Sequence, residues 1–232
     1  MQQSPFLGIL SLDTDFPRIL GDAGNTDSYP YPARQRIIKG AGPTDIVQDG
    51  VPSEHLAERF IQAAQELEGQ GACALVSTCG FLITLQDRIA ASVRIPVLVS
   101  ALSLVPLIGR ATAGPVGILT AHSAHLGQRA LTSAGIEPGT AVIAGMQKCE
   151  AFRNAFLAPT GSFRGQLDTA QIQITAIAQA REICTKMPDV KAIVLECGNL
   201  PPYASEISKA TGKRVYSILD AAKFITAQRL IT

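Results

Sequence analysis

Short apolar runs alternate along the chain with segments in which apolar residues recur at helical spacing. Runs of strand length are expected at residues 5–12, 35–40, 72–78, 96–100, 116–120, 141–144, 192–195 and 215–219. Helical spacing predicts a short helix ending near residue 109 and longer ones at 53–69, 82–93, 124–133, 168–186, 201–210 and 221–230. Because strands that alternate with helices form parallel sheets covered on both faces, we expect an α/β fold.

An internal repeat is the most informative feature of this pattern. The residues LGILS at 7–11 are echoed by VGILT at 116–120, and ALVSTCG at 74–80 is echoed by AIVLECG at 192–198. The two matches occur in the same order in both halves of the chain. The sequence therefore predicts a duplicated α/β half, and hence two pseudo-symmetric lobes with the active site in the cleft between them.

Composition and charge exclude several classes of function. Of the 232 residues, 47% are hydrophobic and 17% are charged, which supplies a buried core and excludes intrinsic disorder. Twenty basic residues balance 19 acidic ones without a dense Lys/Arg run, so nucleic acid is not an expected partner. The longest uncharged apolar stretch, residues 95–109, contains two prolines and is shorter than the roughly 20 residues of a spanning helix. No membrane segment is therefore expected.

The number and spacing of the cysteines and the residues at the amino terminus bear on the compartment in which the protein is expected. Five cysteines without Cys-x-x-Cys or zinc-type Cys/His spacing predict reduced thiols and no metal site. The amino-terminal segment lacks the basic region of a secretory signal. We therefore expect a cytoplasmic protein. The apolar composition and the near-zero net charge also favour a homodimer.

Two Cys-Gly pairs at strand ends are the candidate chemistry. Cys79 and Cys197 each follow a buried strand, at the edge where open α/β sheets bind ligands. The glycine after each cysteine lets the backbone approach a ligand, and the N–H groups of the next turn are expected to lower the pKa of the thiol. Two thiols on opposite sides of a carbon atom can remove a proton from one face and return one to the other. This arrangement predicts a racemase that needs no cofactor.

The remaining candidates are assigned more modest roles. Packing in the core is expected for Cys73, Cys149 and Cys184, so an alkylating reagent is expected to modify Cys79 or Cys197 before Cys73 or Cys184. His122 follows a strand end and is a candidate donor to a substrate carboxylate. The loop at 13–34 is rich in Gly and Pro, which predicts a lid, and its Arg18 is a candidate contact for an anion.

On these motifs the chain resembles the cofactor-independent aspartate/glutamate racemase superfamily over essentially its whole length. The resemblance implies two α/β lobes, at residues 1–100 with 211–232 and at 101–210, because the last helix returns to the first half. It also implies that Cys79 and Cys197 are the acid/base pair of a racemase or epimerase acting at the α-carbon of a small carboxylic or amino acid. The residues expected to bind this substrate are Ser11, Thr78, Gly80, Phe81, Thr120, His122, Gly198 and Asn199.

The chain departs from this superfamily at both cysteines. Glutamate racemases have Cys-Asn-Thr and Cys-Thr-His where this chain has Cys79-Gly80-Phe81 and Cys197-Gly198-Asn199, and Glu196 is expected on the opposite side of its strand from Cys197. The Cys-Gly pattern also looks like the decarboxylase and cis-trans isomerase branches, represented by arylmalonate decarboxylase and maleate isomerase. A non-catalytic protein that binds a carboxylate is a further alternative.

Overall fold

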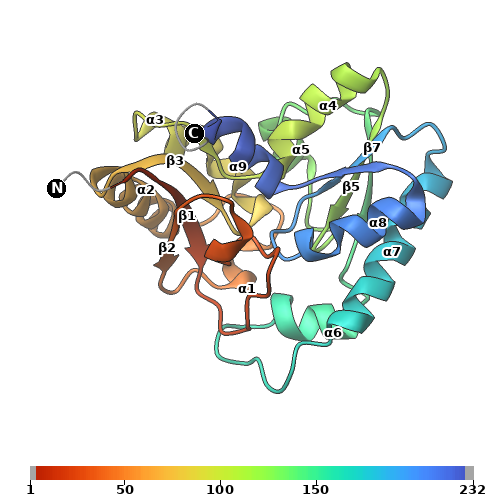
Figure 1. Ribbon diagram of the computed structural model, residues 1–232. Coiled ribbons are helices and arrows are strands. Elements are labelled where there is room, and N and C mark those ends of the chain that lie inside the picture. Colours follow the sequence, from red (N-terminus) through yellow and green to blue (C-terminus); the bar gives the residue numbers. More distant parts are fainter. Residues whose placement is uncertain (1–3, 228–232) are drawn as a thin grey trace.

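The computed structural model describes residues 4–227, and within them the strands form two four-stranded parallel sheets. The first sheet has the order β2-β1-β3-β4, made of Ala33–Ile38, Phe6–Leu12, Ala72–Ser77 and Val97–Leu98. The second has the order β6-β5-β7-β8, made of Ala141–Gly145, Val116–Thr120, Ala192–Leu195 and Arg214–Tyr216. Each half thus orders its four strands identically, which confirms the expected two-lobed α/β fold (Figure 1).

Helices cover both sheets. They are α1 Pro43–Ile46, α2 Glu54–Gly69, α3 Gln86–Ala91, α4 Val105–Thr112, α5 Gln128–Ser133, α6 Glu150–Phe152, α7 Thr169–Lys186, α8 Ala204–Thr211 and α9 Ile218–Thr226. Short 3-10 segments lie at η1 Thr26–Ser28, η2 Gly80–Leu85, η3 Ala101–Leu104 and η5 Pro201–Tyr203, and a π-helical turn at η4 Arg153–Leu157. Among the described residues, no helix has the length and apolar character needed to span a bilayer.

The two longest helices begin and pack as their sequences predict. Ser53 accepts a hydrogen bond from the Leu56 N–H at the start of α2, and Asp168 accepts one from the Gln171 N–H at the start of α7. The apolar face of α2 packs on β1 and β3, and α7 packs on β5 and β6. Burial on both faces explains why the central strands are continuous apolar runs rather than alternating ones.

The carboxyl-terminal segment divides between the two sheets. The expected strand at 215–219 ends at Tyr216, because Ser217 caps α9 by accepting from the Leu219 N–H while Asp220 accepts from the Ser217 N–H. Strand β8 pairs with β7 in the second sheet, whereas α9 packs against β3 and β4 of the first (Figure 1). The chain therefore crosses between the sheets at Ser217, later than the expected boundary at 211. The expected end of this helix, at 230, lies outside the described residues.

The helix expected at 124–133 is also shorter than predicted. It begins at Gln128, because the His122 carbonyl accepts from the N–H groups of His125 and Leu126 and closes a separate turn first. Gly127, the N-cap residue of α5, is the sequence signal for this later start.

The long loop expected at 13–34 ends at residue 32, just before β2 begins, and it contacts the other half of the molecule. Its Ala23 N–H donates to the Gly198 carbonyl at 2.9 Å, and Asp15 accepts from the Phe163 N–H at 3.2 Å. The rings of Phe16 and Phe156 pack edge to face with centroids 4.7 Å apart. These contacts place the loop over the carboxyl ends of the central strands of both halves.

Candidate active site

The two Cys-Gly turns meet at one small cavity between the halves. Cys79 follows β3 and begins η2, Cys197 follows β7, and both thiols are buried against the same space. The enclosed volume is about 20 Å³, which holds roughly one water molecule. Phe16 and Phe156 line the cavity with their rings in contact, so a larger ligand requires the loop of Phe16 or the π-helical turn of Phe156 to move.

Reciprocal backbone packing explains the glycine after each cysteine. A methyl group on Gly80 would lie 2.5 Å from the carbonyl oxygen of Glu196, the residue before Cys197. A methyl group on Gly198 would lie 2.9 Å from the carbonyl carbon of Thr78, the residue before Cys79, and closer still to its oxygen. Carbon atoms that do not bond separate to about 3.5 Å or more, so each turn needs glycine to pack against the other.

The turns occupy equivalent positions in the internal repeat. The Thr78 hydroxyl accepts from the Leu12 N–H at 3.2 Å, and Glu196 Oε2 accepts from the Ala121 N–H at 3.4 Å. Each residue before a cysteine thus binds the end of the first strand of its own half. The pairs of residues are equivalent in position and different in chemistry, because one half has a hydroxyl where the other has a carboxyl group.

The residues expected to bind substrate divide into three groups. Thr78, Phe81 and Asn199 line the cavity together with both cysteines. Behind this wall, at the strand ends and turns, lie Ser11, Gly80, Thr120 and Gly198. His122 lies apart from the lining: its ring stacks on that of His125 with centroids 3.6 Å apart. Burial and the neighbouring His125 lower the pKa of His122, so it is a poor candidate for a cationic donor to a carboxylate.

The pKa of both thiols is raised, which corrects the expectation from the sequence. N–H groups of Phe81 and Leu82 do stabilise a Cys79 thiolate, but burial and the charge of Glu196 outweigh them and raise the pKa of Cys79. Burial and Glu196 likewise raise the pKa of Cys197, and the neighbouring Cys79 adds to the effect. The thiols are therefore close enough to interact electrostatically, and both are protonated in the unliganded site.

Glu196 lies inside the cavity, whereas the sequence led us to expect it on the other side of the strand. Strand pairing ends at Leu195, so the alternation of side chains does not extend to Glu196 and Cys197. Glu196 Oε2 accepts from the Thr120 hydroxyl at 2.7 Å, and Oε1 is buried without a hydrogen-bond partner among the described residues. Burial raises the pKa of this carboxyl group to about 7.

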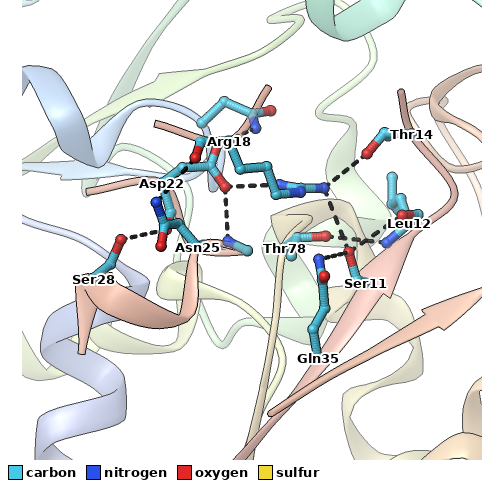
Figure 2. Close-up of polar contacts among 12 residues, drawn as sticks. Ser11, Leu12, Thr14, Arg18, Asp22, Asn25, Ser28, Gln35 and Thr78 are labelled. Carbon is cyan, nitrogen blue, oxygen red and sulfur yellow. Dashed lines mark hydrogen bonds and ion pairs between the residues drawn. The ribbon is translucent and has the colours of Figure 1, made fainter. Parts of the chain in front are cut away.

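A polar chain links Cys197 to Arg18 on the loop of the other half. The Cys197 thiol donates to Asn199 Oδ1 at 3.5 Å, and Asn199 Nδ2 donates to Asp22 Oδ2 at 2.7 Å. Asp22 Oδ1 in turn accepts from Arg18 at 2.7 Å. Figure 2 shows the Arg18 guanidinium lying between Asp22 and the side chains of Ser11 and Thr14. The arginine thereby brings a fixed positive charge to the cavity wall.

Some lining residues had no clear signal in the sequence. Phe16 lies in a loop and Phe156 in the π-helical turn η4 of the other half, and only tertiary packing brings their rings together. Arg18 was a candidate contact for an anion, and its burial at the cavity wall supports that expectation.

The two-lobed fold is shared with solved structures of a decarboxylase and of racemases. Unliganded arylmalonate decarboxylase superposes with a TM-score of 0.59 at 14% sequence identity, covering 97% of this chain and 93% of that one. Picrophilus torridus aspartate racemase superposes with a TM-score of 0.57 at 13% identity, covering 97% and 94%. Allantoin racemase from Klebsiella pneumoniae shares the fold at a TM-score of 0.55 and 15% identity, covering 97% and 87%.

By sequence the chain belongs to the dimethylsulfoniopropionate lyase family. It is 30% identical over 226 residues to dimethylsulfoniopropionate lyase of Durusdinium sp. clade D, covering 94% of this chain and 73% of the relative. It is 29% identical over 234 residues to dimethylsulfoniopropionate lyase 7 of Emiliania huxleyi (strain CCMP1516), covering 96% and 67%. No family model matches the sequence.

Proposed function

We propose that this protein is a cysteine-dependent lyase without a cofactor, which eliminates dimethyl sulfide from dimethylsulfoniopropionate. The family to which the chain belongs supports the substrate. The single structural observation that supports the chemistry is the pair of thiols that share one closed cavity with Arg18. Racemases, decarboxylases and such a lyase have one requirement in common, which is to develop negative charge at the carbon next to a carboxylate.

The proposed elimination uses one thiol as the base. Arg18 binds the substrate carboxylate, one thiol gives up its proton to water as the substrate binds, and the resulting thiolate takes a proton from the α-carbon. The electron pair of that C–H bond forms the new carbon–carbon double bond, while the bond from the β-carbon to sulfur breaks and its electrons stay on sulfur. The products are acrylate, neutral dimethyl sulfide and a protonated thiol, which is the resting state of the site; the net proton released is the one that the thiol gave to water. No oxidant or reductant is consumed.

The differences between the two halves favour elimination over racemisation. A racemase needs two groups of matched capability on opposite faces of the carbon, whereas an elimination needs one base. The cavity has Glu196 where the repeat places Thr78, and Asn199 where it places Phe81. The racemase or epimerase implied by the superfamily resemblance is therefore our second candidate, supported by the presence of both cysteines.

Release of dimethyl sulfide from the purified protein tests this proposal. Wild type is expected to release it from dimethylsulfoniopropionate, as measured by gas chromatography of the headspace. At least one of Cys79→Ala and Cys197→Ala, the variant that lacks the base, is expected to lower kcat/KM by at least about 100-fold, the usual contribution of a positioned acid or base. Cys184→Ala, a cysteine outside the cavity, is the matched control and is expected to leave the rate unchanged.

Other outcomes identify the alternatives. Deuterium incorporation at the α-carbon of aspartate in heavy water, with no dimethyl sulfide release, would support the racemase instead. Binding of the substrate without either reaction would support a carboxylate-binding protein. Undiminished release by both cysteine variants would overturn the role of the thiols. The cytoplasmic location and the homodimer stay predictions.

A further inference from the structure

The charges that line the cavity are not balanced for a substrate with two carboxylates. Among the described residues of the lining, Arg18 is the only cation and Glu196 the only acid. Arg18 is already paired with Asp22 at 2.7 Å, and both side chains are largely buried, at 13% and 3% exposure. Arg18 can therefore serve one substrate carboxylate, and no other described residue of the lining is a cation that could meet a second one. Dicarboxylates such as aspartate, glutamate and malonates meet a repulsive carboxyl group at the other wall.

The two carboxyl oxygens of Glu196 differ in their hydrogen bonding within the described part of the chain. Its side chain is about 1% exposed and Oε2 has two donors, from Thr120 and Ala121. Oε1 has no donor among the described residues, and it lies against Gly80 between the two cysteine turns. A buried acceptor without a partner is rare because its lost hydration is not replaced. Its position in the cavity wall makes a bound ligand the natural partner.

The rest of the wall indicates what kind of cation fits. A primary ammonium group has three N–H donors and needs about as many acceptors when it is buried. Oε1 is the one buried lining atom without a partner in the described part of the chain, and the neighbouring walls are apolar, formed by Leu12, Phe81, Phe156, Leu157 and Ala121. A cation covered by methyl groups has no N–H donors to satisfy. It packs against apolar and aromatic walls and needs only a nearby negative charge.

We propose that Glu196 is the cation-binding residue of this site, and that the cavity selects zwitterions with a carboxylate at one end and a methylated cation at the other. This inference rests on the proposed function, since it assigns the sulfonium end of the proposed substrate to Glu196 and the carboxylate end to Arg18. A cation beside Glu196 also cancels the charge that disfavours a thiolate at Cys79 and Cys197. Substrate charge thus both selects the ligand and activates the base.

A pair of unreactive ligands of nearly equal shape tests the proposal without turnover. The cationic probe is 3-(trimethylammonio)propionate, and the neutral probe is 4,4-dimethylpentanoate, in which carbon replaces the nitrogen. Calorimetric titration of the full chain, at a pH above the raised pKa of Glu196 so that its carboxyl group is ionised, gives the ratio of the two dissociation constants. Wild type is expected to favour the cation at least about tenfold, as for a buried charge pair. Glu196→Gln is expected to reduce that ratio to about twofold or less and to leave the affinity for the neutral probe unchanged.

The matched control is Glu182→Gln, which removes an equal charge from the exposed face of α7 and is expected to keep the wild-type ratio. Unchanged affinity for the neutral probe shows that the site of Glu196→Gln is intact. A wild-type ratio below about twofold, or a Glu196→Gln ratio equal to wild type, would overturn the proposal. Failure of both probes to bind would also overturn it. Because no step of this experiment requires reaction, a protein that selects the cation and releases no dimethyl sulfide would refute the proposed function alone.

Discussion

Replacing Gly80 with alanine is the sharpest test of how the two halves meet. The new methyl group would lie 2.5 Å from the Glu196 carbonyl oxygen and 2.8 Å from its carboxyl carbon. Because normal contacts begin near 3.5 Å, the backbone of one turn must move by roughly 1 Å. Overpacking of a buried site costs about 1 to 3 kcal/mol, and in a domain of this size that lowers Tm by about 3 to 10 °C.

Activity is expected to fall further than stability. The displaced atoms belong to the residue before Cys197, so the movement separates the two thiols and shifts the carboxyl group of Glu196. Positioning errors of about 1 Å cost roughly 100-fold in rate. Gly198→Ala is expected to behave in the same way, because its methyl group meets the backbone of Thr78.

Thermal unfolding followed by circular dichroism and the rate of dimethyl sulfide release measure the two effects. The matched control is Gly69→Ala, at the end of α2, where an added methyl group meets nothing within 4 Å. That variant is expected to keep full activity and to gain up to about 1 kcal/mol, since alanine favours helix over glycine. A Gly80→Ala protein with the Tm and the activity of wild type would refute the packing argument.

Two further predictions follow from burial. Because burial raises the pKa of Glu196 from 4.5 to about 7, its contribution to the free energy of unfolding is fully present below pH 4.5 and is lost as pH rises through 7. Urea denaturation is expected to show that the free energy of unfolding falls by up to about 3 kcal/mol across this pH range in wild type and not in Glu196→Gln. An equal dependence of the free energy of unfolding on pH in both proteins would contradict this prediction. Cys184 is partly exposed whereas Cys79 and Cys197 are buried, so iodoacetamide followed by mass spectrometry is expected to modify Cys184 first, the reverse of the order expected from the sequence. Faster labelling of Cys79 would show that the closed cavity opens readily in solution.

Local patterns in the sequence were sufficient to predict the fold and the place where the two halves meet. Alternating strands and helices required a covered parallel sheet, and the repeated segments at 74–80 and 192–198 required two equivalent strand ends. These features depend on neighbouring residues and on the twofold repeat, so each can be inferred without coordinates. The clustering of Cys79 with Cys197 followed from the same repeat.

Properties that depend on contacts between the halves were decided only by the tertiary structure. The direction of Glu196 depends on where strand pairing stops, and the pKa of each thiol depends on how completely the other half excludes water. His122 does not line the cavity, and its ring stacks on that of His125. Alternation along a strand and the field of a helical turn are local effects. Burial sums over atoms that are distant in the sequence, and in this site it outweighs them.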